Sequence, residues 1–178
     1  MLKIMNKEIE ISKDIEVILN THNILSLQTK LGKLERKLSD NLNVTYHVCE
    51  NSNNSLVLES NNKTILRTEH KNILNMIEGV FYGYQKVLQL VGVGYKAYIE
   101  DSILVLKLGF SHEVKYPIPI DINIICLKPT EILIFGISKE YVNQIAHSIR
   151  NFKKPDIYKG KGLRFNNEEI KLKEGKKK

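Results

Sequence analysis

The segment 155–163, with sequence PDIYKGKGL, holds the residue types of this chain that are best suited to chemistry. Its two lysines alternate with its two glycines, so cations alternate with backbone amides that no side chain shields. Such an order is typical of a phosphate-binding strip, and Tyr158 can stack on a base or lie against a ribose. Since no recognition helix or zipper accompanies the strip, it fits an irregular RNA surface better than a DNA groove.

The net charge of the chain lies in the same region. Residues 150–178 contain 11 Lys or Arg and four Asp or Glu, which accounts for the whole formal charge of +7. A neutral body with a cationic end is suited to a polyanion bound at one place. A disordered basic tail would carry the same charge but few apolar residues. The apolar residues present predict that 155–172 folds back on the preceding domain or becomes ordered on RNA. They are Tyr158, Leu163, Phe165, Ile170 and Leu172.

Catalytic and cofactor-binding patterns are weak. Gly92 and Gly94 lack the third glycine of a dinucleotide-binding loop, and the lysine–glycine strip lacks the spacing of a Walker loop. The five histidines have no metal-ligand spacing, and the adjacent Ser111 and His112 lack a third group to orient a base. We therefore expect no enzymatic activity, cofactor, metal or small-molecule substrate. No run of about 18 apolar residues occurs, so we expect no transmembrane helix.

Hydrophobic periodicity predicts the elements that position these residues. In the first half, alternating apolar residues predict hairpins over 15–27 and 44–59, and spacings of three and four predict a helix over 64–81. The apolar stripe of that helix is expected to be Ile73, Leu74, Ile77, Val80 and Phe81. In the second half, strands are expected over 86–91, 94–100, 103–108, 113–118, 122–127 and 131–136. Three leucines of the strand over 103–108 share one face. Ser138 is expected to cap a final helix whose stripe is Val142, Ile145, Ala146 and Ile149.

The two halves repeat one scheme. At a shift of 77 residues, Gly32 corresponds to Gly109 and Cys49 corresponds to Cys126. The repeat predicts an α+β fold with two duplicated domains, each a small antiparallel β-sheet packed with one α-helix, plus a basic C-terminal extension. The expected domains are 1–82 and 83–152, and the expected extension is 153–178.

Four stretches closely resemble the family of the sixth protein of the large ribosomal subunit, in its bacterial form. They are PDIYKGKGLR at 155–164 with LKEGK at 172–176, NMIEGV at 75–80, LVGVGYKA at 90–97 and LGFSH at 108–112. The family's order and spacing are kept over nearly the full length. The resemblance implies binding to large-subunit rRNA near the base of the lateral stalk, beside the sarcin–ricin loop where translation factors dock.

The resemblance also implies which residues contact rRNA, because the second domain and the C-terminal segment hold most of this contact in the family. Matched by motif, they are Lys153, Lys154, Tyr158, Lys159, Gly160, Lys161, Gly162 and Arg164. Less specific matches are Gly92, Gly94, Tyr95, Lys96, Ser111 and His112. The predicted set is completed by Lys171, Lys173 and Lys176 near the C-terminus.

The expected function is that of a structural, non-enzymatic constituent of the large ribosomal subunit. Its partners would be large-subunit rRNA and neighbouring ribosomal proteins, with translation factors nearby and no membrane; binding would be driven by counterion release. Lys outnumbers Arg 23 to 4 and Ala occurs only twice, which indicates an AT-rich genome. This composition favours the mitochondrial matrix, with an AT-rich bacterium or a plastid as alternatives. Two other functions stay open: a free-standing RNA chaperone or regulator, and a scaffold whose basic tail binds acidic proteins or an anionic membrane.

Overall fold

The computed structural model describes residues 5–20, 22–48 and 54–174. The chain divides into two compact units. The first comprises the chain up to Gly83 together with Ile137–Lys139, and the second comprises Tyr84–Gly136 and the chain from Glu140 onward. Two residues that carry sequence predictions, Cys49 and Lys176, lie outside the described residues.

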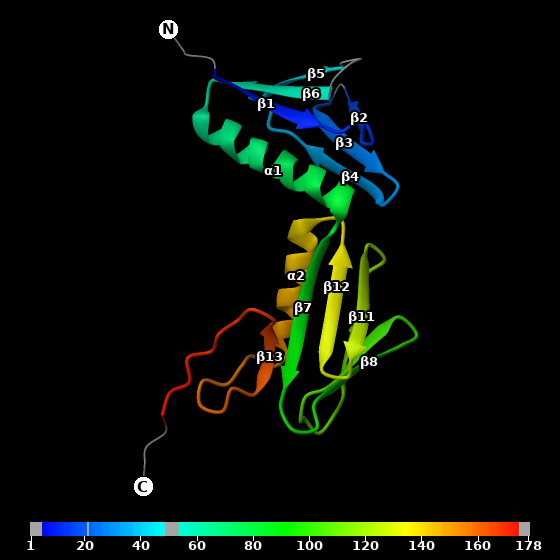
Figure 1. Ribbon diagram of the computed structural model, residues 1–178, viewed down its shortest axis with the longest axis vertical. Helices are drawn as coiled ribbons and strands as arrows, with labels where there is room; N and C mark the ends of the chain where they lie inside the picture. Colours follow the sequence, from blue (N-terminus) through cyan, green and yellow to red (C-terminus); the bar gives the residue numbers. More distant parts are fainter. Residues whose placement is uncertain (1–4, 21, 49–53, 175–178) are drawn as a thin grey trace. The chain divides into compact units, whose positions relative to one another are not determined.

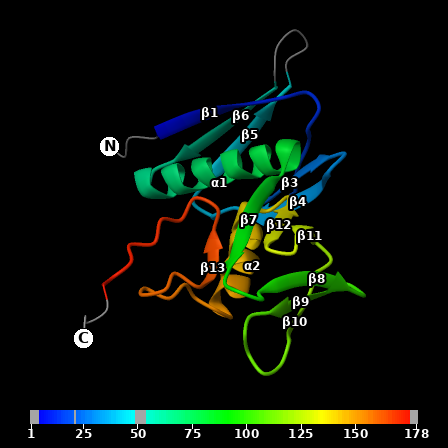
Figure 2. The ribbon, with the colours of Figure 1, turned by 60° about the horizontal axis from the view of Figure 1, so that its bottom comes forward.

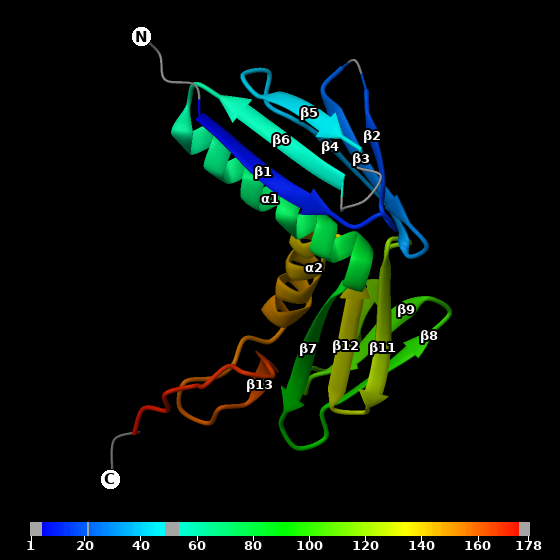
Figure 3. The ribbon, with the colours of Figure 1, turned by 45° about the horizontal axis from the view of Figure 1, so that its top comes forward.

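The first unit contains two antiparallel sheets and one helix (Figure 3). Its elements are β1 (Met5–Ile11), β2 (Glu16–Leu19), β3 (Ile24–Thr29), β4 (Gly32–Lys37), β5 (Asn43–His47), β6 (Asn54–Ser60) and α1 (Lys63–Tyr82). The strand orders are β1-β6-β5 and β2-β3-β4. The Asn62 side chain caps α1 by accepting a hydrogen bond from the Thr64 N–H at 3.0 Å. Gly83, at φ 73°, ends the helix.

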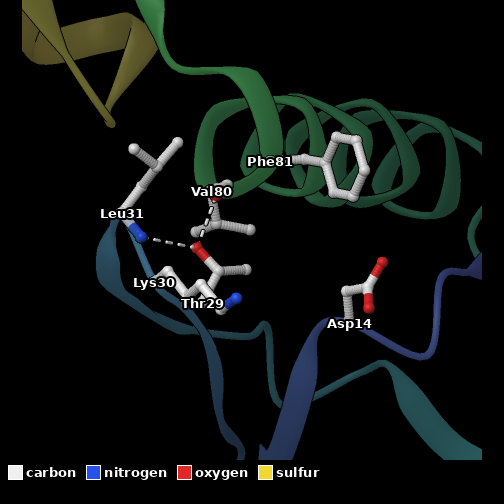
Figure 4. A pocket seen from close by; sticks show the side chains of 6 residues that line it. All are labelled: Asp14, Thr29, Lys30, Leu31, Val80 and Phe81. Carbon is white, nitrogen blue, oxygen red and sulfur yellow. Dashed lines mark hydrogen bonds between the residues drawn. The ribbon is translucent and has the colours of Figure 1, made fainter.

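The buried stripe of α1 differs in part from the predicted one. Ile73 and Val80 are buried as predicted, together with Leu66 and Met76. Phe81 was predicted on the stripe but is 39% exposed. It lines an open pocket of about 350 Å³ at the end of the helix, beside the β3–β4 turn (Figure 4).

Thr29 joins β3 to the end of α1 in this pocket. Its hydroxyl donates to the Val80 carbonyl at 2.5 Å and accepts from the Leu31 N–H at 3.2 Å. One of the carbonyls left without a partner at the end of the helix is thereby satisfied. Within the pocket, the Thr29 hydroxyl thus attaches the end of α1 to β3.

The second unit repeats this arrangement and adds one strand. Its elements are β7 (Tyr84–Val91), β8 (Lys96–Glu100), β9 (Ile103–Lys107), β10 (Val114–Pro117), β11 (Ile122–Lys128), β12 (Glu131–Gly136), α2 (Lys139–Asn151) and β13 (Gly162–Phe165). The strand orders are β11-β12-β7-β13 and β10-β9-β8. Helix α2 covers one face of the four-stranded sheet in Figure 1, and Figure 2 separates β8, β9 and β10 from it.

Strand positions correspond between the units. The order β1-β6-β5 matches β7-β12-β11, and β2-β3-β4 matches β8-β9-β10. Gly32 opens β4 and Gly109 precedes β10, so the two matched glycines occupy corresponding connections. The predicted α+β class is confirmed. The prediction of one sheet per domain is wrong, because each unit divides its strands between two sheets. Periodicity identifies a strand but not the strand with which it pairs.

A single core joins both sheets and the helix of the second unit. The predicted stripe of α2 is confirmed, since all four of its residues are buried. The predicted shared face of Leu104, Leu106 and Leu108 is also confirmed, since all three are fully buried in this core. The loops that leave this core therefore start from fixed positions.

Strand β13 brings the C-terminal segment onto the second unit. It pairs antiparallel with β7, with Gly162 opposite Val91 and Phe165 opposite Leu88. Leu163 is fully buried, and its N–H donates to the Lys153 carbonyl at 2.8 Å. The predicted folding back of this segment is confirmed for β13. The pairing is long-range, and β13 was not itself predicted as a strand.

Candidate nucleic-acid interface

The segment after α2 forms a closed loop, here called the lysine loop (residues 153–162). The Asp156 N–H donates to the Lys161 carbonyl, and the Gly160 N–H donates to the Asp156 carbonyl, both at 2.9 Å. The Asp156 carboxylate accepts from the N–H groups of Tyr158 and Lys159, both at 3.2 Å. One acidic residue therefore organises the turn that carries the lysines.

The glycines of the lysine loop act differently from the prediction. The Gly160 N–H was expected to be available to a phosphate; this is wrong, because the turn already uses it. Gly160 has φ 69° and lets the chain reverse. A Cβ at Gly162 would lie 2.7 Å from the Lys154 carbonyl oxygen and from Pro155 Cα. Both glycines are thus needed for the loop to close, whether or not they also touch RNA.

Three of the four lysine side chains of the loop are exposed to solvent, and the fourth, Lys153, is half-buried. Lys154, Lys159 and Lys161 are exposed. Within the ranges the structure describes, no carboxylate lies at ion-pair distance from any of the three. Tyr158 is 56% exposed beside them. Uncompensated cations on a fixed turn can neutralise the phosphates of a folded polyanion.

A cluster around Phe165 fixes the far end of β13. Lys86 and Arg150 lie 4.5 Å and 5.6 Å from its ring centroid, and the His147 ring lies edge-on at 5.0 Å. Cations over an aromatic ring are attracted by its quadrupole. Arg150 also forms a bidentate ion pair with Glu168. The strand is therefore attached to both α2 and β7.

The ionisation of Glu168 depends on this cluster. Its burial works against the charged form, but hydrogen bonds from Arg150 and from the Phe165 N–H outweigh the burial. The pKa of Glu168 is consequently below its usual value. The C-terminal attachment is strongest where this carboxyl is ionised.

In the predicted group at 92–96, Tyr95 packs two backbone segments together. The Tyr95 ring lies between two backbone segments: a Cβ at Gly92 would be 2.8 Å from it, and a Cβ at Gly109 would be 3.2 Å from it. Tyr95 is half-buried, whereas Gly94 and Lys96 are exposed. Tyr95 thus joins the β7–β8 turn to the β9–β10 loop, and Lys96 offers the cation of this group.

The predicted pair Ser111 and His112 is exposed in the β9–β10 loop. The sequence prediction did not include their neighbour Phe110, which is 42% exposed. The rings of Phe110 and His112 are nearly parallel, at an interplanar angle of 16° and a centroid separation of 6.0 Å. Lys153 of the lysine loop lies over the Phe110 ring, 4.2 Å from its centroid. This contact brings the β9–β10 loop and the lysine loop together.

The remaining predicted residues that the structure describes follow the lysine loop in sequence. Lys171 and Lys173 are exposed, and the Lys173 N–H donates to the Ile157 carbonyl at 2.9 Å. Arg164 is half-buried on β13. The three predicted groups therefore converge: Tyr95 joins the first to the β9–β10 loop, and Lys153 joins that loop to the third. An aromatic residue directly before Ser111 was the available signal for Phe110.

Comparison with known proteins assigns the family. A family model described as Ribosomal protein L6 matches residues 91–166. Large ribosomal subunit protein uL6m of Reclinomonas americana is 44% identical over 188 aligned residues, which cover all of both chains. The chain belongs to the uL6 family. The resemblance predicted from sequence is confirmed.

Bacterial members of the uL6 family are similar over different lengths. Large ribosomal subunit protein uL6 of Spiroplasma citri is 38% identical over 178 residues, 99% of this chain and 98% of its own. The uL6 protein of Rhodospirillum centenum is 50% identical over 106 residues, 60% of each chain. The stretch matched by the uL6-family model includes the β7–β8 turn, the β9–β10 loop, the lysine loop and β13.

Metal-ligand clusters and membrane-spanning helices are not found in the described part of this uL6-family chain. Among residues 5–20, 22–48 and 54–174, no three His, Cys, Asp or Glu side chains gather as a metal site. No helix within those ranges has the length and apolarity to cross a membrane. The interface offers exposed cations and exposed aromatic rings, which are the groups that bind single-stranded or irregular nucleic acid.

Proposed function

We propose that this protein is a structural constituent of the large ribosomal subunit and that its second unit binds large-subunit rRNA. Relatives over the full length of the chain are named as large ribosomal subunit proteins, which supports the assembly. The role is structural rather than enzymatic, in line with the family. The contact surface is the lysine loop, with Lys96 and the β9–β10 loop beside it.

The observation that carries the proposal is the fixed, uncompensated charge of the lysine loop. Lys154, Lys159 and Lys161 extend from a turn that is closed by hydrogen bonds to Asp156. Because the turn is ordered in the free protein, little backbone entropy is lost on binding. The partner of these three lysines must be a polyanion with phosphates at several places, and a folded rRNA meets that requirement.

The finer placement follows the family resemblance. We propose a seat near the base of the lateral stalk, beside the sarcin–ricin region, with neighbouring ribosomal proteins in contact and translation factors nearby. We also propose the mitochondrial matrix as the compartment. The mitochondrial relative and the Lys-rich, Ala-poor composition support this choice.

Salt dependence of rRNA binding tests the proposed contact. The logarithm of the affinity of the purified chain for large-subunit rRNA should fall linearly with the logarithm of the salt concentration. Each neutralised phosphate contributes about −0.7 to −0.9 to the slope. Replacing Lys154, Lys159 and Lys161 by Ala should therefore make the slope shallower by about 2 to 3.

A matched control uses three exposed lysines of the first unit, Lys30, Lys37 and Lys71. Replacing them changes the net charge equally, but the slope should stay that of the wild type. An equal loss in both triple variants would mean that net charge, not the lysine loop, determines binding. In a sucrose gradient the chain should sediment stoichiometrically with the large subunit. Sedimentation apart from it would favour a free-standing RNA regulator and would overturn the proposal.

A further inference from the structure

The β9–β10 loop presents an aromatic ring to solvent that phosphate binding does not require. Leu108 is fully buried, Gly109 turns the chain at φ 73°, and Phe110 follows at 42% exposed. A single exposed Phe is not unusual in a folded protein. Exposure alone therefore does not indicate a function for Phe110.

Cationic and aromatic neighbours hold the Phe110 ring in a fixed orientation. The Lys153 ammonium lies 4.2 Å from the Phe110 centroid, and the His112 ring lies nearly parallel to it. The backbone of Lys153 is itself fixed, because its carbonyl accepts the Leu163 N–H of β13 at 2.8 Å. The ring is thus exposed, held in place and flanked by a cation.

The only carboxylate next to this group in sequence is already engaged. Glu113 accepts a hydrogen bond from the Tyr98 hydroxyl at 3.0 Å and pairs with Lys107 at 2.9 Å. Residues 109–112 carry no acid. The surroundings of the ring are therefore net cationic, which suits a nucleotide better than an acidic or apolar protein side chain.

We propose that Phe110 and His112 form a stacking site for an unpaired nucleobase of the bound RNA. The proposal rests on the proposed function and adds the class of nucleotide that the site takes. The base stacks on the aromatic rings, and Lys153 neutralises the phosphate attached to the same nucleotide. Stacking of this kind accepts any base, because every base has a π-face. The site thus selects an unstacked nucleotide of a loop or bulge rather than a sequence.

The first test separates stacking from charge. Phe110→Leu keeps an apolar side chain but removes the π-face, so it should lower rRNA affinity roughly fivefold to hundredfold. The loss should be the same at every salt concentration, with an unchanged salt slope. Lys153→Ala should instead make the slope shallower by about 0.7 to 0.9. Phe110→Tyr should bind as tightly as the wild type.

A matched control is Phe81→Leu, since Phe81 lies in the first unit and is similarly exposed, at 39%. Its affinity should equal that of the wild type. The chain contains no tryptophan, so Phe110→Trp introduces a single fluorescent reporter. Addition of large-subunit rRNA should quench its emission, whereas Phe81→Trp should not respond.

The outcomes separate the two proposals. If the wild type does not bind rRNA in a salt-dependent manner, the proposed function fails and the stacking site fails with it. If the wild type binds but Phe110→Leu binds equally well, or if Phe110→Trp binds without quenching, only the stacking site is refuted. Circular dichroism spectra equal to that of the wild type establish that each variant is folded.

Discussion

Replacement of Gly162 by Ala should detach the lysine loop and β13, the proposed RNA-binding segment, while the rest of the second unit stays folded. Gly162 has φ 146°, and a Cβ there would lie 2.7 Å from backbone atoms of both Lys154 and Pro155. Backbone atoms cannot move aside as the end of a flexible side chain can. The entry to β13 must therefore shift away from the lysine loop.

The free-energy cost of that shift follows from the two interactions that it breaks. The hydrogen bond from the Leu163 N–H to the Lys153 carbonyl contributes about 0.5–1.5 kcal/mol. Burial of the Leu163 side chain, which is complete, contributes about 1.5–3 kcal/mol. Together they give about 2–4.5 kcal/mol for opening the segment, which is roughly a 30- to 2000-fold change in its opening equilibrium.

Native-state hydrogen exchange of the Leu163 amide measures this opening directly. Its protection should fall by the factor above in Gly162→Ala, and rRNA affinity should fall with it. Gly94→Ala is the control: Gly94 has φ 77°, but no atom lies within 4 Å of its Cβ position. It should therefore cost only the backbone strain of about 1–2 kcal/mol. Unchanged protection of Leu163 in Gly162→Ala would refute the assignment of this glycine to loop closure.

Three further predictions concern acidic residues. Asp156→Ala should weaken rRNA binding although it makes the protein more cationic, because the turn loses the acceptor of two N–H groups. The control Glu169→Ala makes an equal charge change at an exposed site. It should bind rRNA at least as tightly as the wild type. Glu69→Ala should lower the free energy of unfolding by about 1–3 kcal/mol in urea titrations, since it removes the buried carboxylate that accepts hydrogen bonds from Arg36 and Ser39. The folded-state pKa of Glu168 is depressed, so its pair with Arg150 stabilises the attachment of β13 above the ordinary Glu value of 4.5. That stabilisation should disappear as the pH falls through the lower folded value, seen as faster exchange of β13 amides, and Glu168→Gln should abolish this pH dependence.

Local patterns predicted the elements whose own residues show clear apolar periodicity. The stripe of α2 and the leucines of β9 follow from spacing alone, because every residue of one face is buried against the same core. Strands β1, β4 and β13 were missed. Strand β4 reads GKLERK and offers little apolar alternation, and β13 exists only because β7 has a free edge more than 70 residues away.

The candidate site was predicted from its residue types, and the structure changed the roles expected of some of these residues. Lys159 and Lys161 are exposed as a phosphate-binding role requires, and their motif identified them. Gly162 was also identified, but its contact with Lys154 and Pro155 could not be read from sequence because it depends on where β13 begins. Phe110 was missed because its exposure depends on the turn at Gly109 and on a lysine from another segment.

The repeated strand order explains why only the second unit gains the strand that supports the proposed interface. In the first unit the chain leaves α1 at Gly83 and runs directly into β7, so among residues 5–20, 22–48 and 54–174 no further segment pairs with the corresponding edge strand, β1. In the second unit the chain continues beyond α2, forms the lysine loop and pairs with β7 as β13. The edge strand thus acts as a rigid support for the charged turn. The ladder between β13 and β7 fixes the C-terminal end of that turn, and the hydrogen bond from the Leu163 N–H to the Lys153 carbonyl fixes its N-terminal end. In the proposed complex, the gain from each phosphate contact is therefore not spent on ordering the chain.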